Sequence, residues 1–243
     1  MEIFWRTIAY YNSATWLLQI VIILIGIVLT ALLICRPRPC VKMGMKFYMI
    51  GLYSWISVIY YYIYCEERSY NGVMAMFWGV MAIIWIWDTI TGYTTFERTH
   101  KYDILSYILL AMPFIYPLVS LARGLSFPEM TSPVMPCSVV VFTIGLLLLF
   151  AHKVNMFLVL FLCHWSLIGL SKTYFFHIPE DFLLASASAP ALYLFFKEYF
   201  LNNLHKDTEP KAKLINLLLV SVCIALGVLL TVTMFLELTP LEK

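Results

Sequence analysis

Charged side chains are scarce in this sequence: Asp, Glu, Lys and Arg make up only 12% of its 243 residues. A soluble domain usually carries about 25% charged residues. So few charges cannot cover a globule with polar surface, which excludes an ordinary water-soluble domain. Hydrophobic residues make up 62% of the chain, and the mean hydropathy is +0.86. We therefore expect lipid to surround most of the chain.

Motifs that identify a known chemistry are also missing. The sequence contains no phosphate-binding P-loop, no nucleophile elbow, no H-E-x-x-H zinc motif and no Rossmann glycine pattern. The net charge is only +2, and there is no basic arm, so nucleic acid is not an expected partner. The missing motifs weigh against an enzyme without excluding one. The sequence identifies no cofactor and no metal.

The six cysteines do not form a disulfide or ligand framework. Cys35 and Cys40 flank a basic, proline-rich turn, but their spacing is wider than C-x-x-C and no second pair follows. Cys163 and Cys223 lie inside apolar runs, where cysteine usually acts as a small buried hydrophobic residue. The cysteine pattern therefore predicts no metal or redox site.

Long apolar runs make up most of the chain. A spanning helix needs about 20 apolar residues, and eight runs approach that length with short connections between them. Their predicted ranges are 13–34, 46–64, 71–91, 104–122, 134–151, 154–171, 181–200 and 214–236. We predict an all-α fold, a single polytopic transmembrane helix bundle over residues 1–243. The first run is too long for the core of a signal peptide, so we expect it to remain in the mature protein.

Basic residues alternate between the connections. Eleven of the sixteen Lys and Arg residues fall in the gaps after the first, third, fifth and seventh runs. Short loops rich in Lys and Arg stay on the cytoplasmic side of a membrane. The pattern therefore predicts that both termini face the outer, non-cytoplasmic side, and it supports an even number of spans. The lipid bilayer is the first expected partner.

A few polar residues lie inside the runs, where an ionisable group costs at least about 2.5 kcal/mol and is a functional candidate. Asp88 shares a predicted helix face with Trp78 and Trp85, and His164 lies near the midplane. A proton or ion relay would use such groups, whereas capping or interhelical hydrogen bonds are the structural alternative. The candidate intramembrane polar site consists of Asp88, His164, Tyr61 and Ser171.

A second candidate site is predicted at the outward ends of the runs. It consists of Cys137, His177, Glu180 and Asp181. Acidic side chains at a pore mouth can bind a cation or an amine, although Asp181 also suits the N-cap of the seventh helix. Four tyrosines crowd into residues 60–64 and cannot share one helix face. We expect some of them to face the membrane interface and the rest to turn inward.

Several short segments carry a family resemblance. The segments Pro133–Cys137 and Phe142–Leu146 resemble the signature of a bacterial family of multi-pass membrane proteins known only as a domain of unknown function, and so do Tyr11-Asn12, Tyr116-Pro117, Ile168-Gly169 and Pro179-Glu180-Asp181. The resemblance covers about residues 10–200 and departs at Tyr61, where the family often has His. It implies a bacterial cytoplasmic (inner) membrane and no particular activity. It also suggests that the outer Pro-Cys and Pro-Glu-Asp elements lie together.

Function is predicted only as a class. The proline-containing fourth and seventh runs, the midplane His164 and the acidic outer mouth favour a small-solute or ion transporter, a channel or a transport accessory. One alternative is a membrane-embedded enzyme or redox component acting on a lipid or quinone. The other is a structural or sensory subunit of a membrane complex. A second copy of the chain or the subunits of such a complex are the protein partners that these classes imply.

Overall fold

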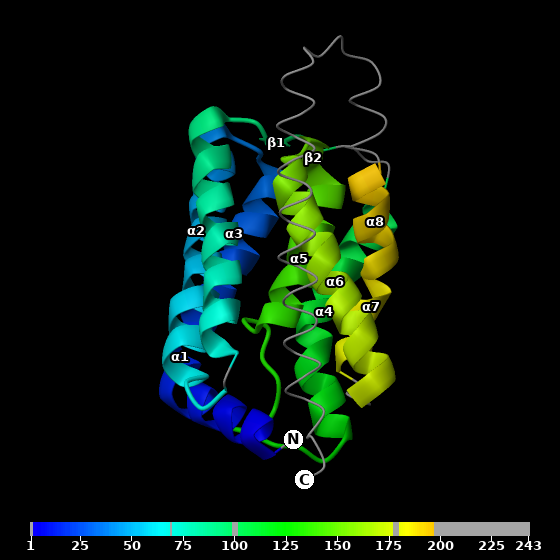
Figure 1. The fold of residues 1–243 in the computed structure, drawn as a ribbon. Helices are drawn as coiled ribbons and strands as arrows, with labels where there is room; N and C mark the ends of the chain where they lie inside the picture. The colour runs from blue at the N-terminus through cyan, green and yellow to red at the C-terminus, as the bar shows by residue number, and fades with distance from the viewer. Residues whose placement is uncertain (1, 69, 99–101, 177–179, 197–243) are drawn as a thin grey trace.

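The structure is a computed structural model that describes residues 2–68, 70–98, 102–176 and 180–196. These residues form a bundle of helices (Figure 1). The helices are α1 (Glu2–Cys35), α2 (Pro39–Trp55), the π-helix η1 (Ile56–Tyr64), α3 (Asn71–Thr91), α4 (Asp103–Ala122), α5 (Pro136–Phe150), α6 (Met156–Phe176), α7 (Asp181–Ser186) and α8 (Ser188–Phe196). The predicted helical fold class is confirmed. The eighth predicted run, 214–236, lies outside the described residues.

Two short strands were not predicted. β1 (Thr95–Phe96) and β2 (Ala151–Lys153) pair antiparallel. They join the connection after α3 to the connection after α5 at one end of the bundle (Figure 1). The fifth run was expected to stay helical to residue 151, but the chain leaves the helix after Phe150, whose carbonyl oxygen accepts a hydrogen bond from the Glu97 N–H at 2.5 Å.

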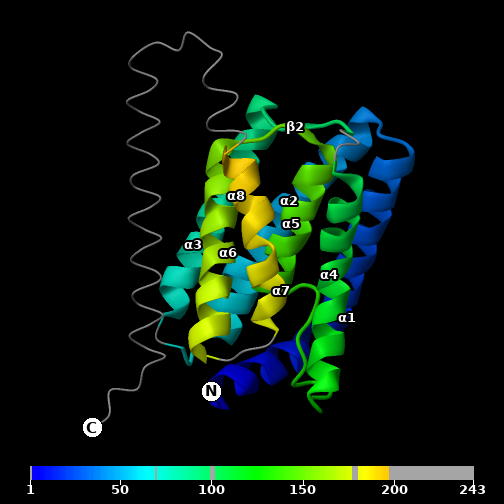
Figure 2. The same cartoon turned by 90° about the vertical axis from the view of Figure 1, so that its right-hand side faces the viewer.

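Three of the described helices are long and apolar enough to cross a membrane: Ile3–Cys35, Asn71–Thr91 and Asp103–Ala122. Three further apolar stretches are shorter: Pro136–Phe150, Met156–Gly169 within α6, and Asp181–Leu194 across α7 and α8. The 34 residues of α1 exceed the roughly 20 that one crossing needs. The extra length lies outside the crossing: the N-terminal part of α1 lies across one end of the bundle before the helix turns and runs along it (Figures 1 and 2).

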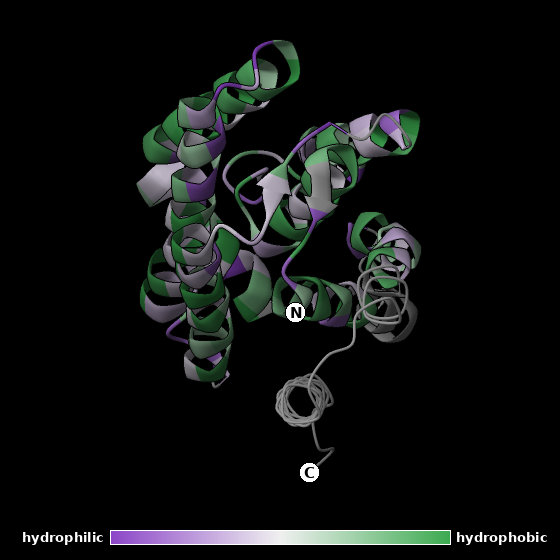
Figure 3. Ribbon diagram, turned by 90° about the horizontal axis from the view of Figure 1, so that it is seen from above, coloured by the Kyte–Doolittle hydropathy of each residue, from purple (hydrophilic) through white to green (hydrophobic). Residues whose placement is uncertain are grey.

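α5 is the core of the bundle. Thirteen of its fifteen residues are buried, as expected for a helix that is apolar all round. α4 approaches it closely because Gly145 has no side chain: a Cβ there would lie 2.9 Å from the Cβ of Leu109. α1, by contrast, exposes large apolar side chains such as Leu17 and Leu24. Figure 3 shows hydrophobic residues over most of the helices, with many of the hydrophilic ones in connections.

The seventh predicted run, 181–200, is not one continuous helix. α7 and α8 are separated by Ala187. Pro190 explains the break, because proline has no N–H to donate and its ring clashes with the carbonyl four residues earlier, that of Ser186. The chain makes a tighter turn instead, in which the Ala187 N–H donates to the Leu184 carbonyl at 3.0 Å.

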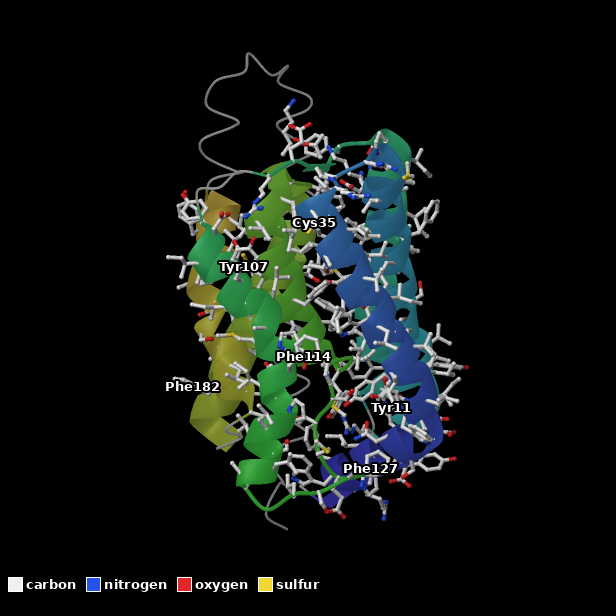
Figure 4. All side chains as sticks on the ribbon, turned by 180° about the vertical axis from the view of Figure 1, so that it is seen from behind. Tyr11, Cys35, Tyr107, Phe114, Phe127 and Phe182 are labelled. Carbon is white, nitrogen blue, oxygen red and sulfur yellow. The ribbon has the colours of Figure 1, made fainter. Side chains whose placement is uncertain are left out.

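The two ends of the bundle differ in charge. The connections after α1, α3 and α5 lie together at one end, which we call the basic end because it carries Arg36, Arg38, Arg98 and Lys153 (Figure 1). The connections after η1 and α4 and the start of α7 lie at the opposite end, which we call the pocket end. In Figure 4, Cys35 marks the basic end, and Tyr11 and Phe127 lie toward the pocket end.

Candidate functional site

A pocket lies between the helices at the pocket end. About 50 Å³ of it is open to the centres of water-sized molecules, several times the roughly 10–15 Å³ that one water needs. We call it the aromatic pocket because its walls are mainly aromatic and apolar, with a few polar groups among them. Its lining residues are Phe4, Trp5, Ile8, Tyr60, Tyr61, Arg68, Tyr70, Met74, Tyr116, Thr131, Met135, Pro136, Cys137, Trp165, Glu180 and Asp181.

The π-helix η1 supplies two tyrosines to the aromatic pocket. Tyr60 and Tyr61 are buried, while Tyr62 is 67% exposed. This confirms the prediction that the tyrosines divide between inward and outward positions. The Ser57 hydroxyl donates a hydrogen bond to the Ala75 carbonyl at 2.6 Å and so ties η1 to α3. π-helical turns are rare and recur at functional sites, so this irregular segment is itself a sign of one.

An ion pair with one buried partner, Glu180, joins the end of α4 to the start of α7 at the aromatic pocket. The Arg123 Nη1 donates to both carboxylate oxygens of Glu180, each at 2.6 Å. The Ser120 hydroxyl donates to the same carboxylate at 3.3 Å. Glu180 is only 2% exposed, and the Arg123 guanidinium lies 5.3 Å from the centre of the Trp5 ring. The charge of Glu180 is therefore matched within the protein.

Cys137 and Asp181 meet in the aromatic pocket. The Cys137 thiol donates to the Asp181 Oδ1 at 3.2 Å, which brings together the Pro-Cys and Pro-Glu-Asp elements that the resemblance linked. Asp181 is the first residue of α7, and Glu180 occupies the N-cap position without a side-chain capping hydrogen bond. The expectation that Asp181 caps this helix is therefore wrong, because its carboxylate faces Cys137. His177 lies outside the described residues.

Asn12 fixes the connection that carries the pocket residues Thr131 and Met135 and leads into α5 at Pro136. The Asn12 side-chain amide donates to the carbonyls of Pro128 and Met130 at 2.8 and 2.7 Å. Both carbonyls belong to the connection between α4 and α5. The segment Tyr11-Asn12, part of the family resemblance, thus has a structural role: it holds this connection against α1.

Asp88 lies at the basic end, away from the aromatic pocket. It is fully buried, as are Trp78 and Trp85, so the predicted common helix face does point into the protein. Its Oδ2 accepts a hydrogen bond from the Lys46 ammonium at 3.0 Å. Its Oδ1 accepts from the Thr94 hydroxyl at 2.7 Å and from the Thr94 N–H at 3.0 Å. These contacts tie α2, α3 and the chain before β1 together.

The remaining intramembrane candidates do not gather around one cavity. Tyr61 lines the aromatic pocket, but Asp88 and His164 are not among the described residues that do. His164 is half-buried on α6, with its ring centre 6.4 Å from that of Phe77. Ser171 belongs to α6, but its side chain lies outside the described part of the structure. A role for each of these residues stays a prediction.

Sequence reasoning missed Arg68, Tyr116 and Trp165 as pocket residues. Arg68 follows two glutamates in a short connection, which made it look like an ordinary solvated charge. In the structure it is 6% exposed. Its neighbour Cys65 is also buried, and burial raises the pKa of the Cys65 thiol. A signal did exist, because Tyr116-Pro117 is one of the resemblance segments and Trp165 lies three residues before another, Ile168-Gly169, but nothing in their spacing indicated that they meet.

Metal binding has no structural support within residues 2–68, 70–98, 102–176 and 180–196. No group of three or more His, Cys, Asp and Glu side chains there could hold a metal ion. The described cysteines Cys35, Cys40, Cys65, Cys137 and Cys163 are free thiols. Cys163 is buried on α6 and donates to the Ala191 carbonyl at 3.0 Å, in agreement with its predicted role as a packing residue. Cys223 lies outside the described residues.

The fold and the pocket define a class: a helical bundle with helices of membrane-spanning length and a buried, partly polar pocket at one end. The chain belongs to the Family of unknown function (DUF6064), whose model matches residues 1–206. The predicted resemblance to an uncharacterised family is thereby confirmed. The eighth predicted run, 214–236, lies beyond the matched residues. No curated protein and no solved structure matches the chain.

Proposed function

We propose that the protein is a multi-pass membrane protein that binds a small solute in the aromatic pocket and takes part in its transport. One observation carries this proposal: a pocket between the helices with a few polar groups in an otherwise apolar bundle. Sites for small molecules have this form, with mostly apolar walls and a small number of placed polar groups.

Irregular helices around the pocket support transport. Tyr60 and Tyr61 lie on the π-helix η1, and Tyr116 lies on α4 between Pro113 and Pro117. α7, which begins with Asp181, is separated from α8 by a break. Discontinuous helices commonly form substrate sites in transporters, where they line the cavity and allow two arrangements of the bundle.

The charge distribution supports an orientation. Short loops rich in Lys and Arg stay on the cytoplasmic side of a membrane. The basic end therefore faces the cytoplasm, and the aromatic pocket opens toward the outside. The proposal includes eight membrane spans, both termini on the outer side, and a location in a bacterial cytoplasmic membrane. The large apolar side chains exposed along α1, α3 and α4 then contact lipid.

Mass spectrometry of small molecules that co-purify with the protein tests the proposal. The chain offers a matched pair of variants on α1. Ile8→Phe adds bulk to the aromatic pocket, whereas Ile23→Phe adds the same bulk to a separate apolar crevice between α1, α2, α4 and α5. We expect wild-type protein and Ile23→Phe to retain a small molecule that Ile8→Phe loses. Equal retention by all three proteins would contradict a ligand site in the aromatic pocket.

Proteoliposomes then separate the functional classes. A labelled form of the retained molecule is expected to enter vesicles that contain wild-type protein and not those that contain Ile8→Phe. Retention without entry would instead indicate a sensory or accessory subunit. Chemical conversion of a lipid or quinone would favour a membrane-embedded enzyme, a candidate motivated by the contact between Cys137 and Asp181 in the same pocket.

A further inference from the structure

We propose that the ligand of the aromatic pocket is a small organic monoanion whose carboxylate binds Arg68. This inference rests on the proposed function, because it requires that the aromatic pocket hold a solute. It adds the chemical class of that solute and the residue that selects it.

Arg68 is a buried charge with neutral partners. Its Nη2 donates to the carbonyl of Phe4 at 3.0 Å and to the hydroxyl of Thr7. Its Nε is buried and has no hydrogen-bond acceptor among the described residues. A guanidinium stays protonated in proteins, and burial of a charge without a counter-charge is costly. An anion in the aromatic pocket would supply both the counter-charge and the missing acceptor.

Three other arginines have the carboxylate partner that Arg68 lacks among the described residues. Arg6 pairs with Glu67, Arg98 with Asp103 and Arg123 with Glu180. The side chains of these three arginines are 61%, 27% and 36% exposed. Arg68, at 6%, is far less exposed than any of them, yet no carboxylate of the described residues pairs with it. The arginine that most needs a counter-charge is thus the one that lines the aromatic pocket.

The other walls also suit an anion with an apolar body. Trp165 is 1% exposed, and its indole N–H has no acceptor among the described residues. An indole N–H can only donate, so it favours a ligand with an acceptor oxygen. Tyr60 and Tyr61 present aromatic rings with centres 4.9 Å apart, against which an apolar or aromatic ligand body can pack.

The acidic residues restrict the ligand to a single negative charge. Glu180 lines the same pocket, but Arg123 matches its charge. Asp181 also lines it and accepts the Cys137 thiol. With only about 50 Å³ open to the centres of water-sized molecules, a dianion would bring its second charge close to the Asp181 carboxylate, and like charges repel.

Thermal-shift titration of the full chain tests the proposal. The protein is placed in phosphatidylcholine nanodiscs, so that no anionic lipid headgroup competes for Arg68. The probes are the carboxylates benzoate and propionate. Each is compared with the neutral amide (benzamide or propionamide) and with the amine of the same carbon skeleton (benzylamine or propylamine). We expect the carboxylates to bind at least about tenfold more tightly than the amides, as a charge-assisted hydrogen bond predicts, and the amines to bind no better than the amides.

Substitutions test whether Arg68 causes the preference for carboxylate over amide. Arg68→Met is expected to remove the preference for carboxylate over amide, whereas Arg6→Met, at the same end of the bundle, keeps it. Because Arg68→Met could fail to fold, Trp165→Phe provides a second variant: it removes one donor and is expected to weaken carboxylate binding several-fold with little effect on the amine. An unchanged carboxylate preference in folded Arg68→Met would overturn the assignment.

The measurements distinguish failure of the anion assignment from failure of the proposed solute pocket. Tighter binding of the amines or amides, lost in Ile8→Phe, would overturn the anion and leave the solute pocket standing. If no probe binds and Ile8→Phe changes nothing that co-purifies, both the anion and the proposed function are wrong.

Discussion

At the scale of single residues, the contacts of Asp88 make it a structural centre. Its carboxylate holds the Lys46 ammonium and Thr94, and both Asp88 and Lys46 are buried. Removal of one partner from a buried ion pair leaves an uncompensated charge and costs about 3–5 kcal/mol. We therefore expect Asp88→Asn to lower the free energy of unfolding by an amount of that order, measured by denaturant unfolding in detergent micelles.

The exposed ion pair between Arg6 and Glu67 is the matched control. Its side chains are 61% and 53% exposed, and exposed pairs contribute about 0–1 kcal/mol. Glu67→Gln should therefore unfold almost like wild type. If Asp88→Asn had the same free energy of unfolding as wild type, the buried ion pair would not contribute to stability. The relay predicted from the sequence would then be the better explanation of an acidic residue at this position.

At the scale of helices, close packing rests on particular glycines. A Cβ on Gly145 would lie 3.0 Å from the backbone nitrogen of Leu110 and 3.1 Å from the carbonyl oxygen of Ser106. Backbone cannot rotate out of the way as a side chain can, so α4 must move. Overpacking of this kind costs about 1–3 kcal/mol. We expect Gly145→Ala to lower the melting temperature in detergent.

Gly51 on α2 provides the control for that experiment. A Cβ there meets nothing within 4 Å, and alanine suits a helix better than glycine does. Gly51→Ala should therefore match or exceed the wild-type melting temperature. Equal effects of the two substitutions would show that the loss at Gly145 does not come from the contact between α4 and α5.

The sequence predicted most helices because apolar length and proline are local signals. It could not tell why a run is apolar: the runs over α1 and α5 look alike, yet α1 is an outer surface and α5 is the core. Four residues of the aromatic pocket were candidates from the sequence, but in two separate sites: Tyr61 in the intramembrane site, and Cys137, Glu180 and Asp181 in the outer-face site. Arg68 and Trp165 were missed because a pocket is made by contacts between helices, and residue spacing along one helix does not reveal those contacts.

At the scale of the whole molecule, the proposed orientation decides which side of the membrane reaches the aromatic pocket. Cys35 and Cys40 are exposed thiols beside the basic turn, and Glu129 is exposed at the pocket end. These positions allow the two ends of the bundle to be labelled separately. The background for labelling is a variant in which the other cysteines are replaced by serine.

A membrane-impermeant maleimide applied to spheroplasts is expected to label Glu129→Cys and to leave Cys35 and Cys40 unmodified until the membrane is permeabilised. The reason is that short loops rich in Lys and Arg resist translocation, so the basic end stays inside. The reverse pattern would turn the pocket toward the cytoplasm and make the solute a cytoplasmic one. Labelling of both ends in intact spheroplasts would contradict a membrane-spanning arrangement of the bundle altogether.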